Sequence, residues 1–315
     1  MGGVLVFSEN SRVSFELLNK AAEIARAGGS TVSLALPGKE PAESFLKRGA
    51  QKVYIPRAGQ EALQDFEAGA YAEALAQIAQ AAGASLILLG CTRRGKELAG
   101  RLAQKLAAGC INDAIDLEVK DGRVVCRRYA LGGMTVMTQE IGTAAAVVSV
   151  MPRAFDPAPE GEAAGEVVEI DLEIKPSRVR LVERQSKAAD STDISEAEVL
   201  VCVGKGMEHR EDLPLAEELA GMLGGEVACS KPVATDQKWL SEDRIVGLSG
   251  KKCKPQLAIC LGISGQVQFN VGIRDARTLV AVNSDPNAYI FQISDYGIVG
   301  DLHEVVPRII SGLKK

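Results

Sequence analysis

Residues 262–301 read GISGQVQFNVGIRDARTLVAVNSDPNAYIFQISDYGIVGD, and this stretch decides the fold. It opens with the turn Gly262–Gly265 (GISG), which follows the apolar run Leu257–Leu261 and precedes a segment able to start a helix. Glycines let a backbone approach a ligand closely, and the free N–H groups at the start of a helix attract anions. The turn therefore predicts a phosphate site, although ordinary turn chemistry explains a single glycine motif equally well.

A second strand end in the same stretch carries polar side chains. The apolar run Thr278–Val282 is followed by Asn283, Ser284 and Asp285. In open parallel sheets the ligand crevice lies outside the carboxyl ends of the strands, so these side chains are placed to bind the adenosine part of a nucleotide. An Asx-type turn before Pro286 is the alternative.

The same pattern recurs over the C-terminal part of the chain. Five apolar runs each predict a strand that ends in glycine or a polar cluster: Glu198–Val203, Glu226–Ala228, Arg244–Val246, Leu257–Leu261 and Thr278–Val282. Helices are predicted over Glu211–Leu223 and Asp301–Leu313. Several such turns at one sheet edge predict a large nucleotide-like ligand such as FAD.

These residues closely resemble the C-terminal domain of electron transfer flavoprotein alpha subunits (the ETF alpha, or FixB, family). The likeness rests on GISGQVQ, VAVNSDPNA, IFQISDYGIVGDL and VVPRII, and it is strong over Ala197–Leu313 and looser over the N-terminal half. It implies an α/β protein with two domains. The N-terminal domain would have a parallel sheet of the electron-transfer-flavoprotein, nucleotide-hydrolase-like type, and the C-terminal domain would be a Rossmann-like, doubly wound FAD-binding domain.

The resemblance also implies which residues contact FAD. They lie in the turns after the predicted strands and at the start of the last helix: Lys205, Ser230, Lys231, Val246, Gly247, Leu248, Ser249, Ser264, Gly265, Gln266, Val267, Gln268, Phe269, Asn283, Asp301 and Leu302. The backbone amides of Ser264, Gly265 and Gln266 are expected to hold the pyrophosphate. Lys205 is either a partner for a flavin phosphate or a surface lysine in a turn. Asp301 also suits the N-cap of the last helix.

Several of these positions depart from the family pattern. Lys205 and Lys231 stand where the family usually has arginine, so each keeps a positive charge but loses the planar, bidentate donor. Phe269 stands where many members have a histidine that donates to the flavin carbonyl, and a phenyl ring cannot donate. Leu248 replaces a polar residue, although Ser249 keeps a hydroxyl. FAD binding with altered redox properties is therefore expected.

The N-terminal half predicts strands that alternate with helices, which is the pattern of a parallel sheet. The strands are expected at Val4–Phe7, Thr31–Leu36, Lys52–Ile55 and Ser85–Leu89, and the helices at Ser14–Ala27, Ala42–Arg48 and Gly69–Ala82. Further strands are expected at Leu117–Val119, Arg123–Tyr129, Ala144–Val150 and Val167–Ile174, with a hairpin turn at Asp121-Gly122 and an exposed loop over residues 153–165.

The turn at residues 91–96 (CTRRGK) is rich in cations and precedes a helical pattern. It could hold a phosphate, but the stronger interpretation is structural: Thr92 caps the helix, and Arg93, Arg94 and Lys96 face solvent or another subunit. The resemblance implies that the nucleotide of this kind of domain belongs to the partner beta subunit. We therefore expect the turn to be empty.

Length and composition set limits on the whole chain. Its 315 residues exceed one typical core, and a polar, small-residue stretch at 187–195 predicts a linker, so we expect domains at 1–190 and 191–315. The net charge of −5 is spread along the chain, and no basic cluster interleaves with aromatics, which argues against nucleic acid. No apolar run reaches the ~20 residues of a membrane span.

The cysteines and histidines bear on metal binding and on the redox compartment. Seven cysteines without a C-x-x-C pair, together with two histidines, supply no ligand set for zinc or an iron–sulfur cluster, so no metal is expected. The cysteines are expected to be mostly buried apolar residues. Without an export signal, they favour the reducing cytoplasm.

The resemblance implies an electron carrier rather than an enzyme. The chain would be the alpha subunit of a heterodimer with a beta subunit, and FAD would carry electrons between a dehydrogenase, of the acyl-CoA dehydrogenase type, and an acceptor. Whether the complex bifurcates electrons is open. No Ser-His-Asp, Cys-His or paired-carboxylate arrangement can be assembled near the turns. The alternative is a nucleotide-binding oxidoreductase or regulatory module on the same fold.

Overall fold

A computed structural model of the protein describes residues 2–36, 41–133, 135–175, 177, 179, 181–183 and 193–314. The chain forms two compact units: unit 1 comprises residues 1–130 and 135–184, and unit 2 comprises residues 131–134 and 185–315. The boundary expected near residue 190 falls outside the described residues, so its position stays a prediction.

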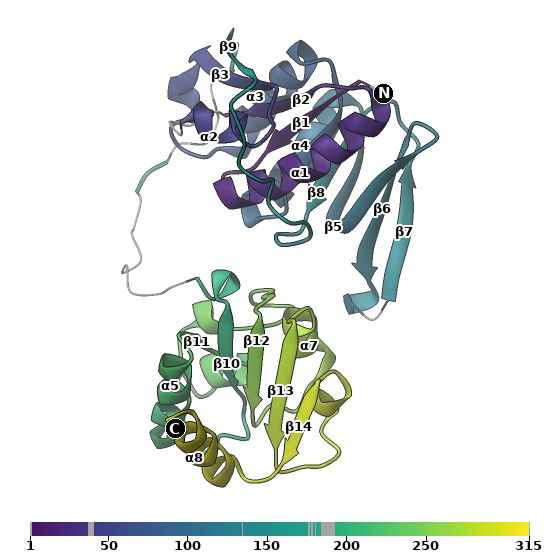
Figure 1. Ribbon diagram of the computed structural model, residues 1–315. Helices are drawn as coiled ribbons and strands as arrows, with labels where there is room; N and C mark the ends of the chain where they lie inside the picture. Colours follow the sequence, from purple (N-terminus) through teal and green to yellow (C-terminus); the bar gives the residue numbers. More distant parts are fainter. Residues whose placement is uncertain are drawn as a thin grey trace. The chain divides into compact units, whose positions relative to one another are not determined.

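Unit 1 is built on a nine-stranded sheet in the order β7-β6-β5-β8-β4-β1-β2-β3-β9 (Figure 1). The strands are β1 (Gly3–Phe7), β2 (Val32–Ala35), β3 (Lys52–Ala58), β4 (Ala84–Gly90), β5 (Gly109–Lys120), β6 (Arg123–Ala130), β7 (Thr135–Ile141), β8 (Ala146–Val150) and β9 (Glu166–Asp171). Neighbouring strands are parallel except in the pairs β5–β6 and β6–β7. The predicted α/β fold with a parallel sheet is confirmed.

Helices cover both faces of this sheet, and each face has its own apolar core. The helices are α1 (Ser11–Gly28), α2 (Ala42–Leu46), α3 (Ala68–Ala81) and α4 (Arg93–Leu106). Leu17 of α1 and Phe45 of α2 pack in one core, while Ile78 of α3 and Leu98 of α4 pack in the other. Because successive side chains of a strand point to opposite faces, β1 and β4 contribute to both cores.

The antiparallel part of the sheet was only partly predictable. Asp121 and Gly122 join β5 to β6 with positive φ values of 49° and 76°, so the predicted hairpin turn is confirmed. Strand β7 was not predicted, because its first four side chains are all exposed and carry no alternating apolar pattern. Residues 153–165 form the expected loop without helix or strand.

Unit 2 holds a five-stranded, fully parallel sheet in the order β11-β10-β12-β13-β14 (Figure 1). The strands are β10 (Val199–Val203), β11 (Glu226–Cys229), β12 (Leu257–Leu261), β13 (Thr278–Asn283) and β14 (Tyr296–Val299), and the helices are α5 (Leu213–Met222), α6 (Lys231–Thr235), α7 (Val267–Ile273) and α8 (Leu302–Leu313). Helices α5, α6 and α8 contribute to one core and α7 to the other. The predicted doubly wound fold is confirmed.

Two features of unit 2 differ from the sequence-based expectation. The strand expected at Arg244–Val246 is wrong: this segment is the end of a 3-10 turn followed by isolated bridges from Ile245 to Cys229 and from Val246 to Lys251. Strand β14 was missed, because all four of its residues are exposed at the edge of the sheet. Ile245 and Val246 are buried, so their apolar character suggested a strand, but they form only isolated bridges; β14 has no buried residue to mark it.

Candidate cofactor site

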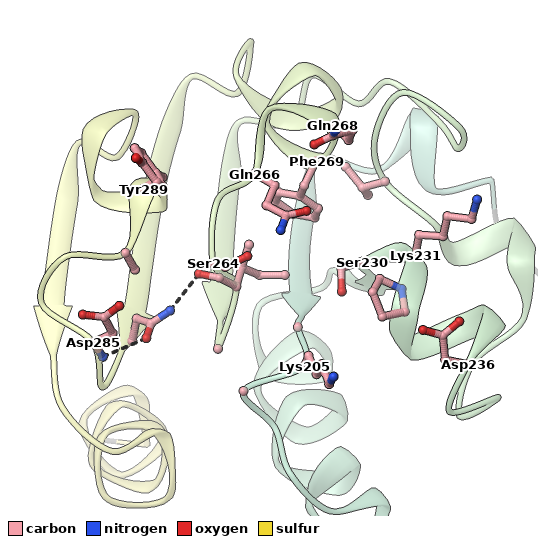
Figure 2. A pocket seen from close by; sticks show the side chains of 18 of the residues that line it. Lys205, Ser230, Lys231, Asp236, Ser264, Gln266, Gln268, Phe269, Asp285 and Tyr289 are labelled. Carbon is pink, nitrogen blue, oxygen red and sulfur yellow. Dashed lines mark hydrogen bonds between the residues drawn. The ribbon is translucent and has the colours of Figure 1, made fainter.

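A pocket of about 970 Å³ opens beside the turns that follow β10, β11, β12 and β13 (Figure 2). The chain passes from β10 to β11 on one side and continues to β12 on the other, so the strand order reverses between β10 and β12. Ligands of open α/β sheets bind outside the carboxyl ends of the strands at this reversal point. The volume lies at the upper end of the usual ~300–1,000 Å³ for ligand pockets.

The pocket wall brings together many of the predicted FAD contacts: Lys205, Ser230, Lys231, Val246, Leu248, Ser249, Ser264, Gln266, Gln268, Phe269 and Asn283. It also contains residues outside that set: Gly204, Gly206, Pro232, Thr235, Asp236, Gly262, Ile263, Asp285, Asn287, Ala288 and Tyr289. Two of these were already singled out in the sequence: Gly262 in the GISG turn and Asp285 as a possible contact of the adenosine part. Most of the others follow a strand end by only a few residues, which is the sequence signal that could have found them. Tyr289 lies farther along the chain, and no such signal marks it.

Five predicted contacts lie outside the wall: Gly247, Gly265, Val267, Asp301 and Leu302. Gly247 precedes Leu248, whose N–H donates to the Gln268 carbonyl at 2.7 Å. Asp301 caps α8 by accepting from the His303 N–H at 2.8 Å, which confirms the N-cap prediction. Leu302 is buried in the core beneath α8. A cofactor contact by any of these five residues stays a prediction.

The glycines of the first turn serve packing. Gly265 has φ +83°, and a Cβ there would lie 2.0 Å from the Ile290 nitrogen. Gly262 has φ +61°, and a Cβ there would lie 2.9 Å from the Gly206 Cα. The expectation that these glycines serve the approach of a ligand is therefore incomplete, because Gly262 packs against the turn after β10 and Gly265 packs against the segment after β13.

The turn after β12 has unused N–H groups. Gln266 is the N-cap of α7 and Ser230 is the N-cap of α6, and neither helix has a side-chain cap. Within the described residues, no N–H of residues 263–268 donates to a protein acceptor. Such groups bind water or an anionic ligand. Because α7 is only seven residues long, these hydrogen bonds rather than its dipole would carry the binding.

Charged side chains of both signs line the pocket. Lys205 and Lys231 form no ion pair within the described part of the chain, so their charges are available to an anion. Asp236 accepts from the Thr235 hydroxyl at 2.8 Å. The Asp285 carboxylate accepts from the Asn287 N–H at 2.9 Å, and this contact turns it toward its own loop.

Asn283 uses both ends of its side chain within the protein. Its Nδ2 donates to the Ile263 carbonyl at 2.8 Å, and its Oδ1 accepts from the Asp285 N–H at 2.9 Å. The second contact is an Asx turn, which was the structural alternative to ligand binding. Asn283 lines the pocket, but the protein already satisfies most of its hydrogen-bonding capacity.

The other part of the wall is apolar. Phe269 is 7% exposed, lines the pocket and packs in the core beside Val246 and Ile263. Leu248 is 58% exposed at the same pocket. A flat aromatic ring fits such a wall, whereas a diphosphate fits the turn with free N–H groups.

The described residues contain no cluster of three or more histidine, cysteine, aspartate or glutamate residues that could hold a metal ion. None of their helices is both long enough and apolar enough to cross a membrane. All seven cysteines are free, and only Cys110 is exposed, so the expected burial of most cysteines is confirmed.

The fold and the pocket define a protein that binds a nucleotide-like cofactor at the reversal point of a doubly wound sheet. Two family models match the chain: the electron transfer flavoprotein domain over residues 4–175 and the electron transfer flavoprotein FAD-binding domain over residues 193–274. The chain belongs to the electron transfer flavoprotein alpha-subunit family.

Full-length relatives agree with this assignment. YdiR of Escherichia coli strain K12, named as an electron transfer flavoprotein subunit, is 35% identical over 316 residues, which cover 100% of this chain and 99% of YdiR. The protein FixB of E. coli strain SMS-3-5 is 34% identical over 315 residues, which cover 99% of this chain and 98% of FixB. Members of this family are electron carriers, and their alpha subunits pair with a beta subunit. FAD is the cofactor of the C-terminal domain.

Proposed function

We propose that this chain pairs 1:1 with a beta subunit in the cytoplasm and carries electrons from a dehydrogenase of the acyl-CoA dehydrogenase type to an acceptor. It has no substrate site of its own. The observation that supports this is the pocket at the β10/β12 reversal, which combines free amides, two lysines and an apolar wall. The seven free cysteines suit a reducing compartment. When bound, FAD supplies the redox chemistry.

Within this pocket, we assign the diphosphate to the amides of Ser264, Gly265 and Gln266, with Lys205 as a nearby cation. The isoalloxazine is assigned to the apolar wall of Phe269 and Leu248. Lys231 and Ser230 begin α6 on the same wall, and a cation there favours negative charge on a reduced ring.

The function is tested on the full chain co-expressed with its beta subunit. We expect a yellow 1:1 heterodimer with FAD in the alpha subunit, whose visible absorbance is bleached by an acyl-CoA dehydrogenase and its substrate. One FAD per heterodimer would mark simple transfer, and two would point to bifurcation. Uptake of a nicotinamide or adenine nucleotide in place of FAD would instead favour the alternative, an oxidoreductase or regulatory module.

The diphosphate assignment is tested by removing a single N–H group. Gln266 has φ −60°, which suits proline, and its N–H has no protein partner, so Gln266→Pro deletes the N–H with little harm to the fold. The preceding Gly265 has no Cβ to clash with the proline ring. One hydrogen bond to a charged group contributes about 1.5–3 kcal/mol, so the FAD dissociation constant should rise about 10- to 100-fold.

Gln266→Ala is the matched control, because it removes the side chain and keeps the N–H. FAD titration of the cofactor-free protein, followed by flavin fluorescence, measures both variants. Equal dissociation constants for the two variants would show that this amide does not hold the diphosphate.

A further inference from the structure

The turn that provides the free amides is held through its carbonyl groups, in addition to the Gly262 N–H, which donates to the Val282 carbonyl at 2.9 Å. Each carbonyl from residue 262 to residue 265 accepts a hydrogen bond from a different element: Gly262 O from Gly206 N (2.9 Å), Ile263 O from Asn283 Nδ2 (2.8 Å), Ser264 O from Ile290 N (3.2 Å) and Gly265 O from Asn270 Nδ2 (2.7 Å). A peptide group is planar and trans, so its C=O and the N–H of the next residue point in opposite directions. Fixing a carbonyl therefore aims the N–H that follows it.

This geometry selects three amides in particular. The carbonyls of Ile263, Ser264 and Gly265 share peptide groups with the N–H groups of residues 264, 265 and 266. These are the amides assigned to the diphosphate. Two of the three contacts that aim them come from asparagine side chains and one from a backbone N–H.

The contact made by Asn270 leaves one of its own polar atoms without a hydrogen bond. Its Nδ2 donates to the Gly265 carbonyl at 2.7 Å, but its Oδ1 is buried and has no hydrogen-bond partner among the described residues. The reverse orientation of the amide would set two oxygens against each other, so the donor end must face Gly265. A buried acceptor without a partner destabilises a protein and calls for an explanation.

We propose that Asn270 is a positioning residue of the cofactor site. By holding the Gly265 carbonyl, it aims the Gln266 N–H at the FAD diphosphate, and the unpartnered Oδ1 is tolerated for that purpose. The proposal rests on the diphosphate assignment made above. Sequence reasoning missed this residue because the contact is made from the helix side of the turn and Asn270 does not line the pocket.

Replacing Asn270 should weaken FAD binding without lowering the stability of the FAD-free protein. Asn270→Leu keeps the side-chain size, removes the donor and also removes the unpartnered Oδ1. In the full chain with its beta subunit, the FAD dissociation constant should rise about 5- to 10-fold, less than for Gln266→Pro, because the N–H remains but is no longer fixed. The melting temperature of the FAD-free protein should stay the same or rise.

Asn19→Leu is the matched control. Asn19 of α1 also donates its side-chain amide to a backbone carbonyl, that of Asp156 at 3.0 Å, but it lies in unit 1. This variant should leave FAD affinity unchanged. Asn270→Ser, which shortens the side chain, should weaken FAD binding as Asn270→Leu does.

Three results would overturn the proposal. The first is an unchanged FAD dissociation constant in both Asn270 variants while Gln266→Pro shows its loss. The second is a lower melting temperature or failure to fold in both Asn270 variants, because the side chain would then serve the fold. The third is FAD binding that is weaker in the Asn270 variants but unchanged in Gln266→Pro, because Asn270 would then not act by orienting the Gln266 N–H. Unchanged affinity in all of them would contradict the diphosphate assignment itself.

Discussion

The two sheets differ in how their helices begin at the point where the strand order reverses. In unit 1 this point lies between β1 and β4, and the helices that follow these strands are capped: Asn10 accepts from the Val13 N–H, and Thr92 accepts from the Gly95 N–H. In unit 2 this point lies between β10 and β12, and the helices that follow these strands, α5 and α7, have no side-chain cap. The protein caps these helices in unit 1, whereas the N–H groups of residues 263–268, before and at the start of α7, have no acceptor among the described residues.

Charge follows the same division. At the end of β1, Glu9 Oε1 accepts from the Thr92 hydroxyl at 2.6 Å, and Glu9 Oε2 is buried without a hydrogen-bond partner among the described residues. A carboxylate there repels an anion, whereas Lys205 follows β10 in unit 2 and attracts one. Lys96, once a candidate for phosphate binding, pairs with Asp113 at 2.7 Å. An empty turn at residues 91–96 stays a prediction, but Glu9 favours it.

The largest expected effect comes from giving α7 the kind of cap that unit 1 has. Asp at position 266 can accept from the first-turn amides of α7 and places a negative charge beside the diphosphate. Gln266→Asp should weaken FAD binding about 100-fold or more, since about 3 kcal/mol of hydrogen bonding is replaced by repulsion. The free energy of unfolding of the FAD-free protein should rise by the contribution of a cap, about 0.5–2 kcal/mol, so its melting temperature should rise as well.

FAD titration and thermal melting of the same samples check both parts of this prediction. Gln266→Asn, a neutral cap, should fall between Gln266→Asp and the parent in affinity. If Gln266→Asp binds FAD as tightly as the parent, the absence of a cap on α7 has nothing to do with the cofactor.

The next effect concerns the apolar wall. Phe269→His offers a donor toward the flavin ring, and one charge-assisted hydrogen bond of about 1.5–3 kcal/mol corresponds to roughly 60–130 mV for the first electron. The midpoint potential should rise by this amount in a reductive titration. Phe269 is buried in the core, so the variant should also melt lower. A lower melting temperature with an unchanged potential would show that residue 269 does not face the ring.

The sequence was most informative where a ligand site and a strand end coincide. Lys205, Ser230 and Ser264 directly follow strands, and such positions can be found by reading apolar runs and the polar residues after them. The interior of the turn was not predictable. The packing of Gly265 against Ile290 and of Gly206 against Gly262 joins residues distant in sequence, which no local spacing encodes.

The missed elements have a related cause. β7 and β14 are edge strands with exposed side chains, so they bury too little apolar surface to leave a pattern. Asn283 shows the limit for single residues. Its position at a strand end and the Asx turn with Asp285 could be predicted, but its contact with Ile263 depends on how the turns after β12 and β13 meet.

Removing a cap in unit 1 should lower the stability, whereas adding one in unit 2 should raise it. Thr92→Val keeps the shape of the side chain but loses the contact with Gly95 and the donor to Glu9. Loss of a cap costs about 0.5–2 kcal/mol, which lowers the melting temperature by about 2–4 °C per kcal/mol in a domain of this size. FAD affinity should not change. Thr92→Ser should restore the stability, and reduced FAD affinity in Thr92→Val would break the comparison between the units.

The smallest expected effect concerns α8 in unit 2, which does have a side-chain cap, Asp301. In α8, His303 lies between two carboxylates: Nε2 is 2.9 Å from Asp212 Oδ2, and Nδ1 is 2.7 Å from Asp301 Oδ1. These partners, Asp212 first, raise the pKa of His303 above its usual value of 6.5. A raised pKa contributes stability that is complete below about pH 6.5 and is lost as the pH rises through the folded-state pKa.

His303→Gln should therefore melt below the parent at pH 5.5 and approach it at pH 9. Because the ring is 39% exposed, solvent screening limits the difference in the free energy of unfolding between variant and parent to about 1 kcal/mol or less. FAD affinity measured over the same pH series then decides the role of Asp301, which was predicted to contact the cofactor. An affinity that changes with pH in the parent but not in His303→Gln would support that contact, whereas identical series would confine Asp301 to capping α8.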